Sequence, residues 1–258
     1  MKDPTLLIDA DIIAYQAASR NEKKFDFGDT GCGKVVDHNR ARRDVDEVIG
    51  ELCDKLDTNK VIICLSDPDV NFRKQLDPSY KGNRQNVVKP ELLSWVKEYL
   101  EHEYRSFKRP RLEADDIMGI LQTSGDRFVQ GPTIIVSEDK DMKTVPGYLF
   151  NPRHDKDKPR LIEPLHAYRF LMEQTLTGDA TDGYPGCRGI GPKSRFVREV
   201  HEAEANRLWG IVVEGYASKG KTEEDALLQA RLAHILWASS YNFKTKKVRL
   251  WRPERLLG

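Results

Sequence analysis

The chain has 258 residues, of which 39% are hydrophobic and 32% are charged, and its formal net charge is +1. This length suits one large α/β domain, or one domain with a helical annex. It contains no apolar run of about 18 residues, which excludes a transmembrane helix, and its first residues do not read as a signal peptide. The four cysteines form no C-x-x-C pair, so we expect free thiols and a cytoplasmic protein.

The apolar pattern predicts strands and helices in alternation. In chain order we predict a strand at Thr5–Ala10, a helix at Asp11–Ser19, a hairpin at Phe25–Val36, a helix capped by Asn39 and running to Asp57, and a strand at Lys60–Ser66. Helices at Pro90–Glu103 and Leu112–Thr123 precede strands at Pro132–Ser137, Leu149–Asn151 and Arg160–Ile162. Helices at Pro164–Leu176, Glu202–Tyr216 and Thr222–Ser239 and a short strand at Lys247–Trp251 follow. This alternation indicates a mainly parallel sheet flanked by helices.

The predicted hairpin contains a motif that resembles a nucleotide-binding loop. Gly28–Lys34 reads G-x-x-x-x-G-K, the beginning of a P-loop. Val35 stands where a P-loop has Ser or Thr to bind Mg²⁺, and no apolar strand leads into the motif. We therefore interpret the segment as a glycine-rich hairpin and expect no nucleotide cofactor.

Carboxylates carry the strongest chemical signal in the sequence. Three of the predicted strands are followed by an acid, and two further acidic groups have i, i+3 spacing, which places two acids on one helix face. In open α/β sheets the carboxyl ends of the strands form the ligand site, so we expect the groups to converge. The nine acids in five segments are Asp9, Asp67, Glu113, Asp115, Asp116, Asp139, Asp141, Asp179 and Asp182.

Each acidic group alone has an ordinary explanation, as a helix cap or a solvated face, but five groups together point to metal binding. Clustered carboxylates repel one another unless a cation lies between them. Mg²⁺ prefers oxygen ligands, and two such ions about 4 Å apart can clamp a phosphodiester. We expect two Mg²⁺ ions, for which Mn²⁺ can substitute. Asp11 is expected to cap a helix, and Glu138 is expected to make no direct contact with a metal ion.

Two further segments suit a nucleic-acid backbone. Gly189-Ile-Gly191 followed by Pro192 and Lys193 predicts a tight turn at a helix N-terminus, where backbone N–H groups bind anions. From Asn71 to Arg111 there are ten Lys or Arg against five Asp or Glu. Basic side chains beside an aromatic suit a single strand, through phosphate contacts and base stacking. The residues expected to bind DNA are Arg73, Lys74, Tyr80, Lys81, Arg84, Gly189, Gly191 and Lys193.

Together these motifs resemble the flap-endonuclease and 5′-3′ exonuclease superfamily, with its PIN-like, Rossmann-like α/β core. The likeness is greatest to the short 5′-3′ exonucleases of podovirus bacteriophages and covers almost the whole chain. The motifs are Ile8-Asp-Ala-Asp11, Tyr80-Lys-Gly-Asn-Arg84, Glu113-Ala-Asp-Asp116, Ser137-Glu-Asp-Lys-Asp141, Gly178-Asp-Ala-Thr-Asp182, Gly189-Ile-Gly-Pro-Lys193 and the closing Tyr241-Asn-Phe and Leu250-Trp-Arg-Pro253.

The resemblance implies roles for individual residues. The first metal site would use Asp9, Asp67, Glu113, Asp115, Asp116 and Asp139, and the second Asp141, Asp179 and Asp182, with Asp139 near both. Lys81 and Arg84 would reach the scissile phosphate, so Lys81, Arg84 and Asp139 are the expected catalytic residues. The glycine turn matches a helix–three-turn–helix motif that holds duplex DNA and binds K⁺ in some members.

The resemblance also implies an organisation and a biological setting. We expect a nuclease core at residues 1–163, with an arch segment at 69–104, and a helix–three-turn–helix subdomain at 164–258. The expected substrates are DNA with free 5′ ends, nicks or flaps, extending to RNA–DNA hybrids. We expect a monomer that works with replication proteins in phage DNA replication, primer removal or recombination.

Two alternatives share part of this pattern. A PIN-type endoribonuclease would have the acidic core but needs no helix–three-turn–helix segment, so Gly178–Lys193 counts against it. A catalytically inactive DNA-structure binder should have lost acids, and the complete set counts against that.

Overall fold

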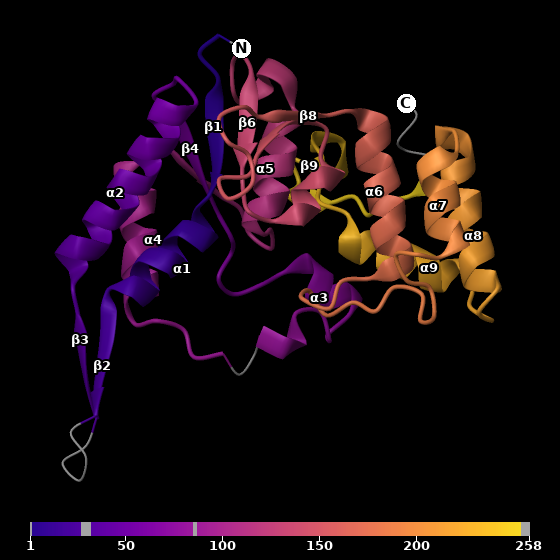
Figure 1. Ribbon diagram of the computed structural model, residues 1–258, viewed down its shortest axis with the longest axis horizontal. Coiled ribbons are helices and arrows are strands. Elements are labelled where there is room, and N and C mark those ends of the chain that lie inside the picture. Colours follow the sequence, from indigo (N-terminus) through magenta and orange to yellow (C-terminus); the bar gives the residue numbers. More distant parts are fainter. Residues whose placement is uncertain (1, 27–31, 85–86, 254–258) are drawn as a thin grey trace.

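A six-stranded sheet forms the centre of the protein (Figure 1). The computed structural model describes residues 2–26, 32–84 and 87–253. The strand order is β5-β4-β1-β6-β7-β8, and all neighbours are parallel except β7 and β8. The strands are β1 (Thr5–Asp9), β4 (Lys60–Leu65), β5 (Ser106–Lys108), β6 (Thr133–Val136), β7 (Gly147–Phe150) and β8 (Arg160–Ile162). The predicted α/β fold with a mainly parallel sheet is therefore confirmed.

The three central strands are apolar on both sides because helices cover both faces of the sheet. Leu6, Ile8, Ile63 and Val136 pack on one face, and Leu7, Ile62 and Ile135 on the other, with exposed fractions of 3% or less. A strand buried on both faces reads as a continuous hydrophobic run, which is why sequence alone located these three.

Each face of the sheet has its own set of helices. The helices α1 (Ala10–Arg20), α2 (His38–Lys55) and α4 (Leu92–Glu103) cover one face, and α5 (Ala114–Gln122) with the C-terminal segment covers the other. The caps differ from those expected. Asp37 rather than Asn39 caps α2, and Asp9 rather than Asp11 caps α1, because the side chain that reaches a free backbone N–H of the first turn lies two residues earlier, just before the helix begins.

The segment between α1 and α2 is a hairpin that projects from the body (Figure 1). Its antiparallel strands are β2 (Glu22–Asp26) and β3 (Cys32–Val36), which confirms a hairpin at the P-loop-like motif. Part of that motif, residues 28–31, lies outside the described residues. Among the described cysteines, Cys53, Cys64 and Cys187 are free thiols. No described helix is both long enough and apolar enough to cross a membrane.

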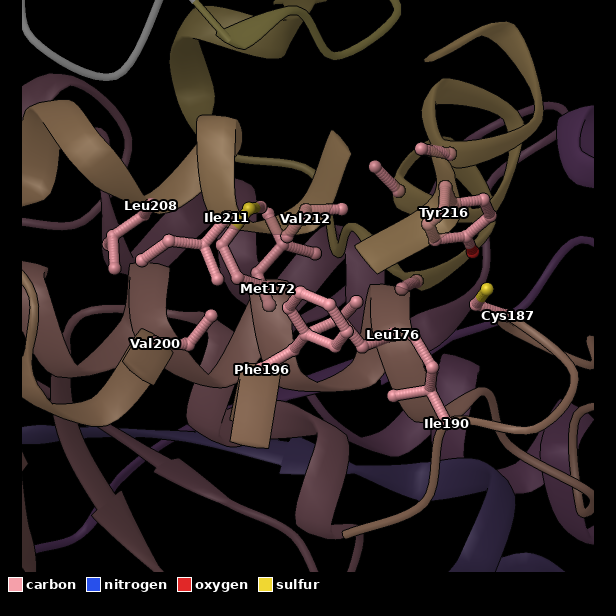
Figure 2. Close-up of a cluster of buried hydrophobic side chains, with 14 of the residues drawn as sticks. Met172, Leu176, Cys187, Ile190, Phe196, Val200, Leu208, Ile211, Val212 and Tyr216 are labelled. Carbon is pink, nitrogen blue, oxygen red and sulfur yellow. The ribbon is translucent and has the colours of Figure 1, made fainter. Parts of the chain in front are cut away.

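Four helices after β8 pack around a separate hydrophobic cluster (Figure 2). These are α6 (Pro164–Thr177), α7 (Arg195–Glu202), α8 (Leu208–Ala217) and α9 (Glu223–Ala233). The predicted helix at Glu202–Tyr216 was wrong in its start, because α7 already ends at Glu202 and α8 begins only at Leu208. The predicted helix at Thr222–Ser239 was too long. The subdomain boundary at residue 163 stays a prediction.

Several short elements escaped prediction or were placed only roughly. The edge strand β5 and the helix α3 (Phe72–Leu76) are too short to show a period in the sequence. The 3-10 turns are η2 (Gly82–Arg84), η3 (Gly125–Arg127), η4 (Lys140–Thr144), η5 (Ala205–Arg207) and η6 (Ala238–Ser240). The predicted final strand is the second strand of a small hairpin of β9 (Tyr241–Asn242) and β10 (Lys247–Val248).

Gly119 on α5 should tolerate no side chain. A Cβ there would lie 2.5 Å from the Leu236 carbonyl oxygen and 2.9 Å from Ile235 Cγ2. We expect Gly119→Ala to lower the free energy of unfolding by about 1–3 kcal/mol, measured by urea denaturation. Gly50 on α2 is the matched control, since nothing lies within 4 Å of its Cβ position. Gly50→Ala should raise stability by about 0.5–1 kcal/mol, and a loss equal to that of Gly119→Ala would contradict this packing.

Candidate active site

The carboxyl ends of the central strands carry the first group of acids. Asp9 is the last residue of β1, and Asp139 follows β6 through Ser137 and Glu138. Asp115 comes from the first turn of α5. Ser137 Oγ donates a hydrogen bond to Asp9 Oδ2 at 3.3 Å and accepts one from the Asp139 backbone N–H at 3.1 Å. The loop after β6 is thereby tied to the end of β1.

These acids perturb one another strongly. Burial raises the pKa of Asp9 to about 7, with further contributions from the charges of Asp11 and Asp139. The pKa of Asp115 is raised well above its ordinary range by burial and by the charges of Asp9 and Asp139. Asp115 Oδ1 is buried and has no hydrogen-bond partner among the described residues. An unpaired carboxylate oxygen among other acids is the condition that a cation relieves.

A second group of acids lies where η4 meets the loop after α6. Asp139 caps η4 by accepting a hydrogen bond from the Asp141 backbone N–H at 2.8 Å. Burial raises the pKa of Asp141 to about 7, with a further contribution from Asp139. Asp179 Oδ1 accepts hydrogen bonds from the backbone N–H groups of Thr181 and Asp182. This compact turn holds Asp179 and Asp182, both nearly buried, beside the acids of η4.

The arch base, which we define as Tyr80–Arg84, is attached to the Asp179–Asp182 turn. The Lys81 backbone N–H donates to the Asp182 carbonyl at 2.8 Å, and the Asn83 amide donates to the carbonyls of Ala180 and Thr181. Lys81 holds a left-handed backbone conformation with φ 53°, which costs a non-glycine residue about 1–2 kcal/mol. The contacts to the turn hold this conformation in place.

The cationic side chains of the arch base lie directly on the acids. Lys81 Nζ is 2.6 Å from Glu113 Oε1 and 3.4 Å from Asp182 Oδ2, and Arg84 Nη2 is 2.9 Å from Asp182 Oδ1. Burial alone would raise the pKa of Glu113. Lys81 and Arg73 stabilise its charge more strongly, so the pKa of Glu113 is lowered to about 2. The site therefore places two cationic side chains next to two groups of carboxylates.

The donor set fits divalent cations in type and charge. Among the described residues, no three acidic, histidine or cysteine side chains are already arranged to hold a metal ion. Lysines instead lie against several of the acids. Burial alone would raise the pKa of Asp179. Lys140 Nζ contacts Asp179, and this contact lowers its pKa overall. Asp9, Asp115 and Asp139 have no ion pair among the described residues, and Lys140 Nζ approaches Asp141 only to 3.8 Å. All four of these acids have raised pKa values.

Two of the expected site residues, Arg73 and Asp116, form a buried ion pair that joins parts of the fold. Arg73 is 2% exposed, so it is not available to DNA as expected. Its guanidinium donates to Glu113, to both oxygens of Asp116 and to the carbonyls of Leu232 and His234. Asp116 is fully buried and also accepts from the backbone N–H groups of Glu113 and Leu236, so no oxygen of this expected metal ligand is free. Its partners show that it holds Arg73.

Tyr80 was expected to stack on a base, and the structure corrects this as well. Its ring is 2% exposed and belongs to the hydrophobic cluster of the C-terminal helices. Its hydroxyl donates to Asp182 Oδ2 at 3.0 Å and approaches Glu113 Oε2 at 3.3 Å. Tyr80 therefore contacts two acids of the site from the hydrophobic cluster, where its buried ring cannot stack on a base.

The remaining expected residues lie at the margins of the site. Asp67 Oδ1 and Oδ2 accept backbone N–H groups of Asp69 and Arg111, which lowers the pKa of Asp67. A groove with a volume of about 600 Å³ runs from Asp67 past Lys74 to Lys81 and Arg84. Gly189, Gly191 and Lys193 are exposed on the loop between α6 and α7.

Three residues of the site were missed by sequence reasoning. Lys140 contacts Asp179, Asn83 holds the turn, and Gln174 on α6 donates to Asp141 Oδ1. Lys140 stands between two predicted ligands, and this position could have identified it. Gln174 has no local signal, because it reaches the site only through the packing of α6 on η4. Glu138 forms an ion pair with Arg153.

The raised pKa of Asp9 predicts a pH dependence of stability in chelator. A carboxyl with a folded pKa of about 7 and an ordinary value of 3.8 contributes stability at low pH that is lost as pH rises through 7. Between pH 5 and pH 8 this loss amounts to at most about 3 kcal/mol. The lowered pKa of Glu113 acts only at lower pH, so it does not mask the effect.

Urea denaturation at pH 5 and pH 8 measures this dependence. We expect the wild type to lose stability between these values and Asp9→Asn to lose distinctly less, because an amide does not titrate. An equal loss in both proteins would show that Asp9 is not buried among other acids.

Comparison with known proteins shows the family to which this chain belongs. The family described as 5′-3′ exonuclease, N-terminal resolvase-like domain, matches residues 4–147. The chain is 31% identical to the exonuclease of Escherichia phage T7, over 96% of this chain and 93% of that protein. It is 28% identical to the exodeoxyribonuclease of Enterobacteria phage T3, over 96% of this chain and 92% of that one.

Solved structures share the fold. A phage T5 protein co-crystallised with metal ions has a TM-score of 0.63 at 16% identity, and the match covers 90% of this chain and 89% of that one. A mutant of the T5 5′-exonuclease has a TM-score of 0.61 at 15% identity, with 90% and 88% covered.

The mainly parallel sheet with acids at its carboxyl edge is the core of a nuclease. The chain belongs to the 5′-3′ exonuclease family, and it is an enzyme of that kind. The resemblance inferred from the motifs is thereby confirmed.

Proposed function

We propose that this enzyme hydrolyses DNA phosphodiesters from free 5′ ends, nicks or flaps, with two divalent metal ions as cofactors. The observation that carries the proposal is the convergence of acids from β1, α5, the loop after β6 and the Asp179–Asp182 turn beside Lys81 and Arg84. The relatives support it, since they are named exonuclease and exodeoxyribonuclease. One T5 structure is described as a flap endonuclease complex with DNA and metal ions.

The acids divide into two candidate ligand sets. Asp9, Glu113, Asp115 and Asp139 would hold one ion, and Asp141, Asp179 and Asp182 the other, with Asp139 close to both. Asp67 and Asp116 are left out because backbone N–H groups, together with the buried Arg73 in the case of Asp116, occupy both of their oxygens. Glu113, Asp179 and Asp182 are kept because each has an oxygen that is paired with a Lys or Arg side chain of the site, which a metal ion can displace. When bound, Mg²⁺ activates a water and stabilises the leaving oxygen. Mn²⁺ has the same preference for oxygen ligands.

Lys81 and Arg84 orient the scissile phosphate in this scheme. Both side chains rest on acids that a bound metal would neutralise, which leaves them free to turn to a phosphate oxygen. An ammonium or guanidinium aimed at the developing negative charge stabilises the transition state. Lys74, exposed in the adjacent groove, suits a contact to the 5′ single strand.

The C-terminal helices supply the grip on the duplex. Gly189 and Gly191 expose backbone N–H groups just before α7, and Lys193 follows them on the surface. This arrangement suits a helix–three-turn–helix that holds a phosphate, with a K⁺ site at its carbonyls. We place the division between nuclease core and DNA-binding subdomain at residues 163 and 164, where β8 gives way to α6. We further propose that the enzyme cleaves RNA–DNA hybrids and acts in phage DNA replication.

Labelled substrates test the function. Duplex, nicked, flapped and RNA–DNA hybrid substrates, each labelled at the 5′ or the 3′ end, are incubated with Mg²⁺ and, as control, with EDTA. We expect release from the 5′ label first, products with 5′-phosphates and no cleavage in EDTA. Release from the 3′ label first, or cleavage in EDTA, would refute the proposal. A preference for single-stranded RNA would favour the PIN-type ribonuclease instead.

A further inference from the structure

The loop that carries the glycine turn is seated on the C-terminal end of α8. Ile190 is 5% exposed, and Cys187 Sγ lies 4.0 Å from the Gly215 carbonyl oxygen (Figure 2). A Cβ at Gly215 would lie 2.9 Å from Leu176 and 3.2 Å from Ile190 Cδ1, so only glycine lets the loop approach this closely. The end of α8 therefore fixes where the glycine turn lies.

The same end of α8 leads into a second basic turn. The backbone N–H groups of Lys219 and Lys221 both donate to the Tyr216 carbonyl, and Gly220 takes a left-handed conformation with φ 67°. The Lys219 side chain lies across the first turn, with Nζ 3.6 Å from the position that a Cβ on Gly189 would occupy. Burial raises the pKa of the Cys187 thiol, and the charges of Lys219 and Lys221 partly offset this rise. The two lysines therefore lie near the loop that carries Cys187 and the glycine turn.

The cations around the two turns are free to bind an anion. Arg188, Lys193, Lys219 and Lys221 are exposed, and no ion pair links any of them to an acid within residues 2–26, 32–84 and 87–253. Two of the three acids in the first turn of α9, Glu223 and Asp225, have hydrogen-bond partners. Glu223 accepts from Trp209 Nε1 at 2.7 Å, and Asp225 accepts from the Thr222 backbone N–H at 2.9 Å.

We propose that the Ser218–Lys221 turn and the Arg188–Lys193 turn form one two-turn clamp on the phosphate backbone of duplex DNA. Lys219 and Lys221 are the new contacts, and they come from a different helix pair than the glycine turn. This inference rests on the proposed action on DNA. Exposed backbone N–H groups bind a phosphate at the first turn, while the second turn adds charge without reading sequence.

The test is the affinity of Lys219→Ala/Lys221→Ala for a duplex with a 5′ overhang, measured in EDTA by fluorescence anisotropy at several salt concentrations. We expect binding at least ten times weaker than in the wild type. The slope of log K against log salt should be shallower by about 2, since each phosphate contact contributes about 0.9. The conservative variant Lys219→Arg/Lys221→Arg should keep most of the wild-type affinity and most of the wild-type salt slope.

The matched control is Lys244→Ala/Lys246→Ala, which removes the same charge from the exposed turn between β9 and β10. It should bind almost as the wild type does. Equal affinity and equal salt slope in the Lys219/Lys221 variant and the wild type would overturn the clamp. If the wild type itself neither binds nor cleaves duplex DNA, the proposed function fails instead, so the two failures are distinguishable.

Discussion

Replacing Asp139 by asparagine is expected to reduce DNA cleavage by a factor of about 10³ or more, while DNA binding in EDTA stays close to that of the wild type. Asp139 interacts with acids of both groups, with Asp9 and Asp115 on one side and Asp141 on the other. Asparagine keeps the oxygen that caps η4 but loses the charge. A loss of several kcal/mol of transition-state stabilisation corresponds to such a factor.

The control for this substitution is the preceding residue. Glu138→Gln should retain cleavage, because the Glu138 carboxylate pairs with Arg153 and lies near Gln16. Single-turnover rates on a labelled duplex compare the two. Cleavage by Asp139→Asn within tenfold of the wild type would exclude a shared metal ligand at this position.

Replacing Arg73 by alanine should have the largest effect on stability, a loss of about 3–5 kcal/mol, because it leaves a buried charge without its partner. Asp116 is fully buried and receives two hydrogen bonds of 2.8 Å from the guanidinium. The carbonyls of Leu232 and His234 at the end of α9 would lose their donor as well. Urea denaturation at one pH measures the change.

Lys74 is the matched control for Arg73, since it is the next residue of α3 but is exposed. Lys74→Ala should change stability by less than about 0.5 kcal/mol and weaken binding of single-stranded DNA. A loss below about 1 kcal/mol for Arg73→Ala would contradict the view that this residue joins α3 and α5 to the C-terminal helices.

The comparison of these two neighbours shows what sequence alone can predict. Strands β1, β4 and β6 were predicted well because burial on both faces leaves a local apolar pattern. The acids that follow them were found because strand ends of a parallel sheet meet at one edge. Arg73 and Lys74 looked alike because the partner of Arg73 at Leu232 lies 159 residues away, beyond any local pattern.

Other errors have the same origin. Tyr80 is an aromatic beside basic residues, and only the packing of the C-terminal helices shows that its ring is buried. The division between α7 and α8 is a short turn at Ala203–Arg207, which contains no proline or glycine to signal it. The sequence also did not show that the basic turn after α8 lies beside Gly189, because that position depends on how Gly215 and Ile190 pack.

The most direct test of the central claim is an anomalous difference map from crystals of the protein soaked in Mn²⁺. We predict two peaks, one contacted by Asp9, Glu113, Asp115 and Asp139, and one by Asp141, Asp179 and Asp182. The ammonium groups of Lys81 and Lys140 should have moved off Glu113 and Asp179. A single peak, or peaks outside these acids, would contradict the two-metal account.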